Sequence, residues 1–156
     1  WGQIVYSLQA AERGFAGGSV TTQIGHKIYA IAGWGRTNLR TYYNLNFDPN
    51  DAITVGLGGW WGKQHQFNLY RIQDDRLHTG QQVTHFVWRY HPNDTHRLNL
   101  DLASKREHPD ADSPWLQGDS VSLTWDWDRY FARAAIDHKV NFTDDTQKRL
   151  SLGWHF

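Results

Sequence analysis

The chain contains no cysteine and no methionine, and it has only four prolines among 156 residues. The absence of cysteine excludes disulfide frameworks, thiolate zinc sites and cysteine nucleophiles. No single sign of charge dominates, because 16 Lys and Arg residues balance 16 Asp and Glu residues. A nucleic-acid-binding domain is normally basic, so no nucleic-acid partner is expected.

Long apolar runs are missing as well. No run approaches the roughly 18 apolar residues of a transmembrane helix, and the mean hydropathy is -0.70. No secretory signal peptide is expected ahead of Trp1. The length predicts one domain over residues 1–156. The chain is therefore expected to be either soluble or a membrane β-barrel, whose alternating strands give weak hydropathy signals.

Alternation of apolar and polar residues is present almost everywhere, whereas helical spacing is never sustained. The sequence predicts an all-β chain with antiparallel strands. Turn residues such as those of Asp48–Asp51 and His91–Asp94 separate the strands. Ten strands are predicted, at residues 2–11, 19–35, 39–47, 52–61, 65–74, 80–91, 95–106, 118–127, 129–141 and 147–156.

Each predicted strand has one apolar and one polar face, because successive side chains point to opposite sides of a sheet. Leu98, Leu100 and Leu102, for example, alternate with Arg97 and Asp101. A soluble sandwich turns such leucines inward, and a membrane barrel turns them toward lipid. Alternation alone leaves both arrangements open.

The positions of the large aromatic residues favour the membrane barrel. If the last strand runs from the outside to the periplasm, these residues fall at the periplasmic strand ends, where amphipathic rings form an interfacial girdle. The predicted girdle consists of Trp34, Trp60, Trp61, Trp88, Tyr90, Trp125, Trp127, Tyr130, Trp154 and Phe156.

The predicted connections differ in length at the two ends of the strands. Those on the periplasmic side are short and lie at residues 36–38, 62–64, 92–94 and near 128. Those on the outer side are mostly longer and lie at residues 12–18, 48–51, 75–79, 107–117 and 142–146. Short periplasmic turns and longer outer loops are typical of outer-membrane barrels.

The last nine residues alternate Leu150, Leu152 and Trp154 before a terminal Phe156. This segment resembles the C-terminal strand signal of bacterial outer-membrane proteins. The resemblance implies a location in the bacterial outer membrane, surrounded by its lipid, and insertion by the barrel-assembly machinery.

The Arg-, Asp- and aromatic-rich strands also resemble the C-terminal barrels of exopolysaccharide-export porins. That resemblance implies that Trp1 is a fragment boundary and that the native barrel has more than ten strands. A free-standing barrel stays open as an alternative, since ten is an even number and places both termini in the periplasm.

The polar faces of the predicted strands would line the barrel. Arg97, Asp126 and Arg129 are expected to form one cluster, and Asp137 is expected to face Arg149, because buried charges must pair or stay wet. These charges either fill a narrow barrel or guide a polar solute or glycan through it. The predicted lumen residues are Arg97, Asp101, Lys105, Asp126, Arg129, Arg133, Asp137 and Arg149.

Two histidines interrupt the apolar face. His26 and His138 share the phase of lipid-facing neighbours and are predicted to lie near the outer strand ends beside Lys148. Phosphorylated lipopolysaccharide headgroups occupy that level in an outer membrane, and they accept hydrogen bonds from cations and imidazoles. A lipopolysaccharide contact formed by these three residues is expected.

Two other classes of function stay open. A soluble β-sandwich could bind carbohydrate by stacking Trp60, Trp61, Trp125 and Trp127 on sugar rings, with Gly56, Gly58 and Gly59 allowing close approach. An omptin-like or lipid-modifying enzyme would use acids and histidines of the outer rim, namely Asp74, Asp75, His78, Glu107, His108, Asp110, Asp112, Asp144 and Asp145.

The spacing of these rim residues is not distinctive. His108, Asp110 and Asp112 are of residue types that bind metal ions, but their spacing forms no metal-site pattern. No catalytic residue, metal or cofactor is predicted. The sequence is most consistent with an outer-membrane barrel that serves as a conduit or surface scaffold for polar glycans.

Overall fold

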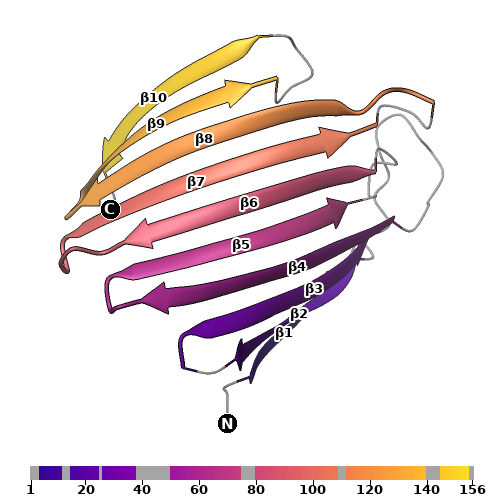
Figure 1. Ribbon diagram of the computed structural model, residues 1–156, viewed down its shortest axis with the longest axis horizontal. Helices are drawn as coiled ribbons and strands as arrows, with labels where there is room; N and C mark the ends of the chain where they lie inside the picture. The colour runs from indigo at the N-terminus through magenta and orange to yellow at the C-terminus, as the bar shows by residue number, and fades with distance from the viewer. Residues whose placement is uncertain are drawn as a thin grey trace.

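A computed structural model describes residues 4–11, 15–24, 26–37, 50–74, 80–108, 112–139 and 145–154. These ranges contain ten β-strands and no helix (Figure 1). The strands are β1 (Ile4–Ala11), β2 (Phe15–Ile24), β3 (Ile28–Thr37), β4 (Asn50–Trp61), β5 (His65–Asp74), β6 (Gln81–Tyr90), β7 (His96–Glu107), β8 (Leu116–Trp127), β9 (Tyr130–His138) and β10 (Thr146–Trp154). The all-β class is confirmed, and no helix in the described ranges could cross a membrane.

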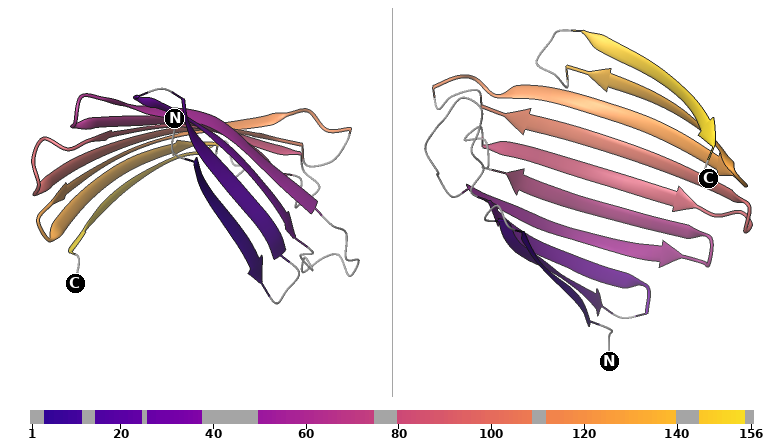
Figure 2. Two further views of the ribbon diagram at one scale, coloured as in Figure 1. Left: turned by 90° about the horizontal axis from the view of Figure 1, so that it is seen from below. Right: turned by 180° about the vertical axis from the view of Figure 1, so that it is seen from behind.

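All ten strands form one sheet in which every strand is antiparallel to its neighbours in the sequence. The sheet bends into an arch, and its edge strands β1 and β10 lie apart (Figure 2). In the described residues β1 pairs with β2 alone and β10 with β9 alone. The predicted closure into a barrel is therefore not present in this part of the chain.

The strand predicted over residues 19–35 is wrong, because this segment forms β2 and β3, joined at residues 25–27. Ile24 and Ile28 are register partners, so both side chains point to one face of the hairpin. A continuous strand would also place them on one face, since they are four residues apart. Alternation cannot separate the two cases.

The next prediction, a strand over residues 39–47, lies outside the described residues. The predicted turn at 48–51 extends two residues too far, because Asn50 and Asp51 already belong to β4. The other predicted strands are present with bounds that differ by a few residues.

The register divides the side chains into two faces. The polar face includes one row of directly opposed residues, which are Tyr29, Gly58, Asn68, Val87, Asp101, Ser122, Ala135 and Arg149. The apolar face includes the next row, which is Ala30, Leu57, Leu69, Phe86, Leu102, Val121, Ile136 and Lys148.

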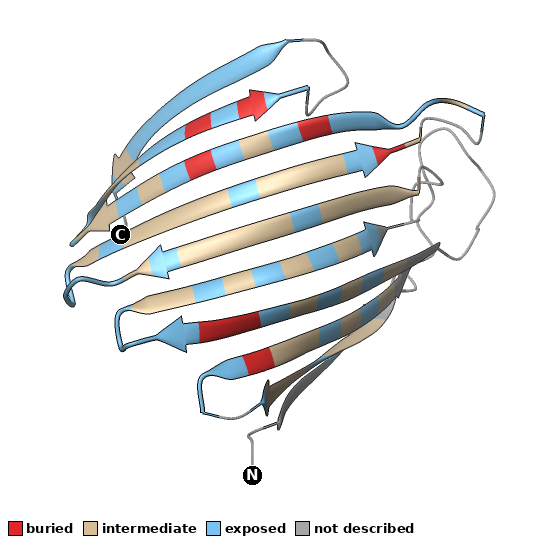
Figure 3. Cartoon of the chain, viewed as in Figure 1, coloured by how far each residue is buried: buried red, intermediate tan, exposed pale blue. Residues whose placement is uncertain are grey.

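The buried side chains lie mainly on the polar face, and the apolar side chains are largely exposed. The apolar face is exposed, with Leu57 at 55%, Leu69 at 51% and Val121 at 45% relative accessibility. Among the described side chains the only buried hydrophobic ones are Tyr29 and Ala135, and both belong to the polar face. Buried residues occur in small separate patches (Figure 3). The described sheet has no hydrophobic core.

Glycines on the polar face admit bulky neighbours. A Cβ at Gly58 would collide with the ring of Tyr29 and with Asn68 Oδ1, and a Cβ at Gly56 would lie 2.5 Å from the Tyr70 Cβ. The two tyrosines therefore lie over these strand positions because the glycines leave room for them.

We predict that Gly58→Ala lowers the free energy of unfolding by about 1–3 kcal/mol, because the added methyl overlaps a buried ring. Gly33→Ala is the matched control, since its nearest neighbour would be 3.5 Å away. Alanine at that position should be neutral or stabilising by up to about 1 kcal/mol. Urea titration of the refolded variants measures both, and equal effects would contradict the packing argument.

Candidate functional site: a polar face and a banded apolar face

The two ends of the strands carry different connections. Residues 25–27, 62–64, 91–95 and 128–129 connect strands at one end, which we call the short-turn rim. Residues 12–14, 38–49, 75–80, 108–115 and 139–145 connect strands at the other end, the long-loop rim. The predicted asymmetry is thus present, with the short connection at 25–27 in place of the one predicted at 36–38.

Backbone hydrogen bonds join neighbouring turns of the short-turn rim. His91 N donates to Gln64 O at 2.8 Å, and Asp128 N donates to Thr95 O at 2.8 Å. Asn93 Oδ1 accepts from the amides of Thr95 and His96 at 3.1 and 2.9 Å. These bonds order the rim without a core beneath it.

Hydrogen bonds and one ring stack connect the polar face from β3 to β7. Tyr29 donates to Asn68 Oδ1 and accepts a 3.1 Å bond from Gln66. His85 stacks on Tyr70 with ring centroids 5.0 Å apart, and its Nδ1 lies 3.2 Å from Asp101 Oδ1. Because a carboxylate only accepts, this contact is a hydrogen bond when Nδ1 carries the ring proton.

Two further groups of contacts lie on this face, one from β8 to β10 and one between β6 and β7. Asp137, at 7% accessibility, accepts a 2.6 Å hydrogen bond from Ser120 and forms an ion pair with Arg149. The buried Glu107 pairs with Lys105 at 2.9 Å and accepts from Gln81 at 2.8 Å. The buried carboxylates of this face therefore have charged or polar partners, as burial of charge requires.

The predicted lumen residues fall largely on the polar face. The expected contact of Asp137 with Arg149 is confirmed. Arg97 and Asp126 are register partners, and Asp126 accepts a 3.3 Å bond from Asn99. Arg129 departs from the expectation, since it lies exposed in the β8–β9 turn. The register places on this face Arg97, Asp101, Lys105, Asp126, Arg133, Asp137 and Arg149.

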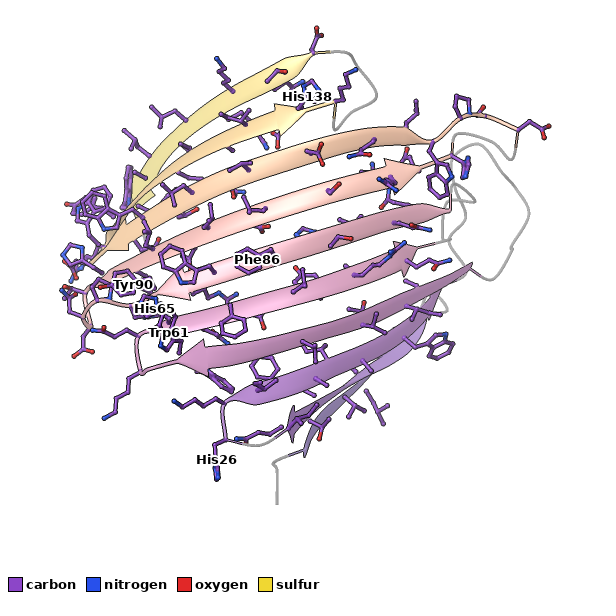
Figure 4. All side chains as sticks on the ribbon, viewed as in Figure 1. His26, Trp61, His65, Phe86, Tyr90 and His138 are labelled. Atoms are coloured by element: carbon purple, nitrogen blue, oxygen red, sulfur yellow. The ribbon has the colours of Figure 1, made fainter. Side chains whose placement is uncertain are left out.

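Aromatic rings gather on the apolar face at the short-turn rim, and we call this group the aromatic belt (Figure 4). One half surrounds His65, which stacks on Tyr90 at 4.5 Å and on Trp88 at 5.8 Å. The other half surrounds Trp125, whose ring lies 5.0 Å from Trp127. The members are Trp61, His65, Trp88, Tyr90, His96, Trp125, Trp127, Tyr130 and Trp154.

The two histidines of the belt were not singled out from the sequence. Trp88 Nε1 donates to His65 Nδ1 at 3.3 Å, and Trp125 Nε1 donates to His96 Nδ1 at 3.2 Å. Each histidine is the first residue of its strand. The repeated placement of a histidine directly after a short turn was the available signal, but only the register shows its tryptophan partner.

One residue of the predicted girdle, Trp34, and one of the predicted lipopolysaccharide contact, His26, are wrongly placed because β3 is a separate strand. Trp34 pairs with Ile53 near the long-loop rim, so it lies at the opposite end from Trp61. His26 lies in the β2–β3 turn at the short-turn rim, whereas His138 ends β9 at the long-loop rim (Figure 4). His138 and Lys148 do share the exposed apolar face, and Phe156 lies outside the described residues.

The residues weighed for an enzyme do not converge in the described part of the chain. Glu107 belongs to the contacts above, and His108 Nδ1 lies 2.9 Å from Ser113 O with its ring 3.6 Å from that of Trp115. No group of three or more acids or histidines that could hold a metal occurs among the described residues. The structure does not describe the side chains of Asp74, Asp75, His78, Asp110 and Asp144.

The sandwich alternative is wrong for the described strands, because all of them belong to one sheet. Gly56 and Gly58 of β4 receive tyrosine side chains of the same chain. Comparison with protein-family models, curated proteins and solved structures finds no match to this chain.

We predict that Asp137→Ala lowers the free energy of unfolding by about 1–3 kcal/mol, because Ser120 and Arg149 lose their shared acceptor at a buried position. Asp94→Ala, an exposed acid of the β6–β7 turn, is the control and should change it by less than about 0.5 kcal/mol. Denaturant unfolding compares the two, and an unaffected Asp137 variant would show that the contact is not stabilising.

Proposed function

We propose that the sheet is part of the wall of a bacterial outer-membrane β-barrel and that its polar face lines a conduit for polar glycans. One observation carries this proposal: the aliphatic face is exposed, while the polar face contains the buried carboxylates. A sheet in water buries its apolar face, whereas a membrane barrel turns it toward lipid.

The height of the aliphatic strip supports a membrane location. Along β8 the apolar side chains of this face extend from Val121 to Trp127, and along β4 they extend over about eight residues, from Ile53 to Trp61. About eight residues at roughly 3.4 Å each span about 27 Å, or about 20 Å of height for strands tilted by about 40°. The lipid-facing band of outer-membrane barrels is about 25 Å tall and is bordered by aromatic girdles.

A barrel location also sets a requirement for the edges. Backbone groups in hydrocarbon must be hydrogen-bonded, so an open edge is not tolerated there. The proposal therefore requires that β1 and β10 pair with each other or with further strands. The resemblance to exopolysaccharide-export porins supports further strands, and a lumen of ten strands is otherwise largely filled by side chains.

The free charges of the polar face suggest the kind of solute. Within the described residues Arg89 and Arg133 have no ion pair, and Arg133 donates only to Ser122, at 3.4 Å. The two arginines share a cross-strand row with Asn99 and Thr124 between them. Cations and amides in one row are suited to hydroxyl-rich or anionic glycans.

The proposal predicts opposite outcomes for two arginine substitutions on one face of β8. Leu123 is 43% accessible at mid-strand, and Gln117 is exposed near the long-loop rim. We expect Leu123→Arg to cost about 2–4 kcal/mol of folding free energy in phosphatidylcholine vesicles, and Gln117→Arg at most about 1 kcal/mol. Folding is followed by tryptophan fluorescence and by gel mobility before and after heating.

A soluble protein gives a different result. Exposed leucine tolerates arginine in water with changes within about 0.5 kcal/mol. Equal stabilities of the two variants, together with a folded state in buffer without detergent, would overturn the proposed membrane location.

The conduit predicts a charge-dependent current. In planar bilayers the reversal potential should indicate anion preference, and Arg89→Glu with Arg133→Glu should move it toward cation preference. Lys27→Glu with Lys63→Glu, which changes two exposed turn residues, is the matched control and should leave it nearly unchanged. A selectivity that follows only the control, or no conductance at all, would contradict the conduit.

A further inference from the structure

The apolar face ends in a polar band at the long-loop rim. Toward this rim, exposed cationic and imidazole side chains occupy four different strands: Arg71 of β5, Arg106 of β7, His138 of β9 and Lys148 of β10. Lys148 lies in the row of Leu57 and Val121, Arg71 and His138 lie one row nearer the rim, and Arg106 lies two rows nearer. The register places all four on the apolar face. We call this group the basic band.

Amide side chains of neighbouring strands hold the two arginines against the sheet. Arg71 Nη2 donates to Gln82 Oε1, and Arg106 Nε donates to Gln117 Oε1 at 3.2 Å. Gln82 and Arg106 are register partners, as are Arg106 and Gln117. A guanidinium has five N–H donors, so each arginine keeps donors for another acceptor.

The balance of charge in the band is positive. Among the described side chains of these three rows the single carboxylate is that of Asp119, whose register partner is His138. Three fixed cations therefore face outward against one acid. At the short-turn rim the same face carries the aromatic belt instead, so its two margins differ in chemistry.

We infer that the basic band binds the phosphate groups of lipid headgroups at the long-loop rim, as lipopolysaccharide would present them. The inference rests on the proposed membrane location and names lipid phosphate as the partner of the apolar face at its long-loop rim. Phosphate accepts bidentate hydrogen bonds from guanidinium. A cation directly beside the aliphatic strip lies at the level where headgroups meet acyl chains, and there each Lys or Arg favours anionic lipid by about fivefold.

The band extends the lipopolysaccharide contact expected from the sequence and corrects its members. His138 and Lys148 stay in it, His26 leaves it, and the two arginines enter it. On β3, Trp34 lies in the same register row as Arg106 and is 47% accessible. An amphipathic indole is suited to that interfacial depth.

The test removes three cations from the band or three from the opposite rim. The band variant is Arg71→Gln, Arg106→Gln and Lys148→Gln. The matched control is Lys27→Gln, Lys63→Gln and Arg129→Gln, which removes the same charge from exposed turns of the short-turn rim. Each folded protein, in a neutral detergent, is titrated with lipopolysaccharide and with the same lipopolysaccharide after removal of its phosphates.

We expect the band variant to bind phosphorylated lipopolysaccharide on the order of 100-fold more weakly than the unchanged protein, from three cations at about fivefold each. The control should lose less than about threefold, and the dephosphorylated lipid should bind all three proteins alike. Equal losses in the two variants, or a band variant with unchanged affinity, would overturn the inference.

Folding in phosphatidylcholine vesicles without lipopolysaccharide separates this inference from the proposed function. If all three proteins insert and only phosphate recognition is missing, the inference fails alone. If the unchanged protein does not insert, the membrane location fails and the inference fails with it.

Discussion

Backbone hydrogen bonds between neighbouring strands hold this sheet together, and the rest of the structure depends on them. Ten strands in sequence order satisfy one another's backbone groups, and the described residues contain no hydrophobic core that adds to the ladder. Two consequences follow. The outer edges of β1 and β10 keep unpaired backbone groups in the described chain, and the aliphatic face has no covering layer. Both need a partner that the single sheet does not supply.

On the polar face, the bend of the sheet buries charged and polar side chains. Bending brings the polar side chains closer, which is why Glu107, Ser122 and Asp137 are buried although their strands pack against no second sheet. A buried carboxylate without a partner is costly, so the positions of Lys105, Arg149 and Ser120 are tied to those acids. Glycines of β4 give the same face room for tyrosine rings. The face is therefore an ordered polar surface and not only a solvated one.

The apolar face has three levels, and each has its own chemistry. The aromatic belt combines amphipathic rings with histidines that accept indole N–H groups. The aliphatic strip has no described charge at its mid-strand row between β3 and β9. The basic band closes the opposite margin with guanidinium groups held by glutamines. Such an order matches the change of environment across one leaflet boundary, a hydrocarbon layer and a second boundary.

Alternation in the sequence by itself determined the all-β class, the division of each strand into two faces and the collection of most large aromatic residues at one end. These follow from the two-residue period of an extended chain, which needs no knowledge of neighbours. The contact of Asp137 with Arg149 was also accessible, because a single hairpin connects β9 to β10 and limits the register.

Only the tertiary structure decided whether residues 24–28 turn or continue, because Ile24 and Ile28 share a face in either case. That single turn reverses the chain direction in β3. Trp34 therefore lies near the long-loop rim and His26 at the short-turn rim, whereas the sequence predicted the other end for each. Pairings such as Trp88 with His65 and Arg106 with Gln117 depend on register across strands. Register is set by the lengths of the connections and the bend of the whole sheet, which no local pattern of residues encodes.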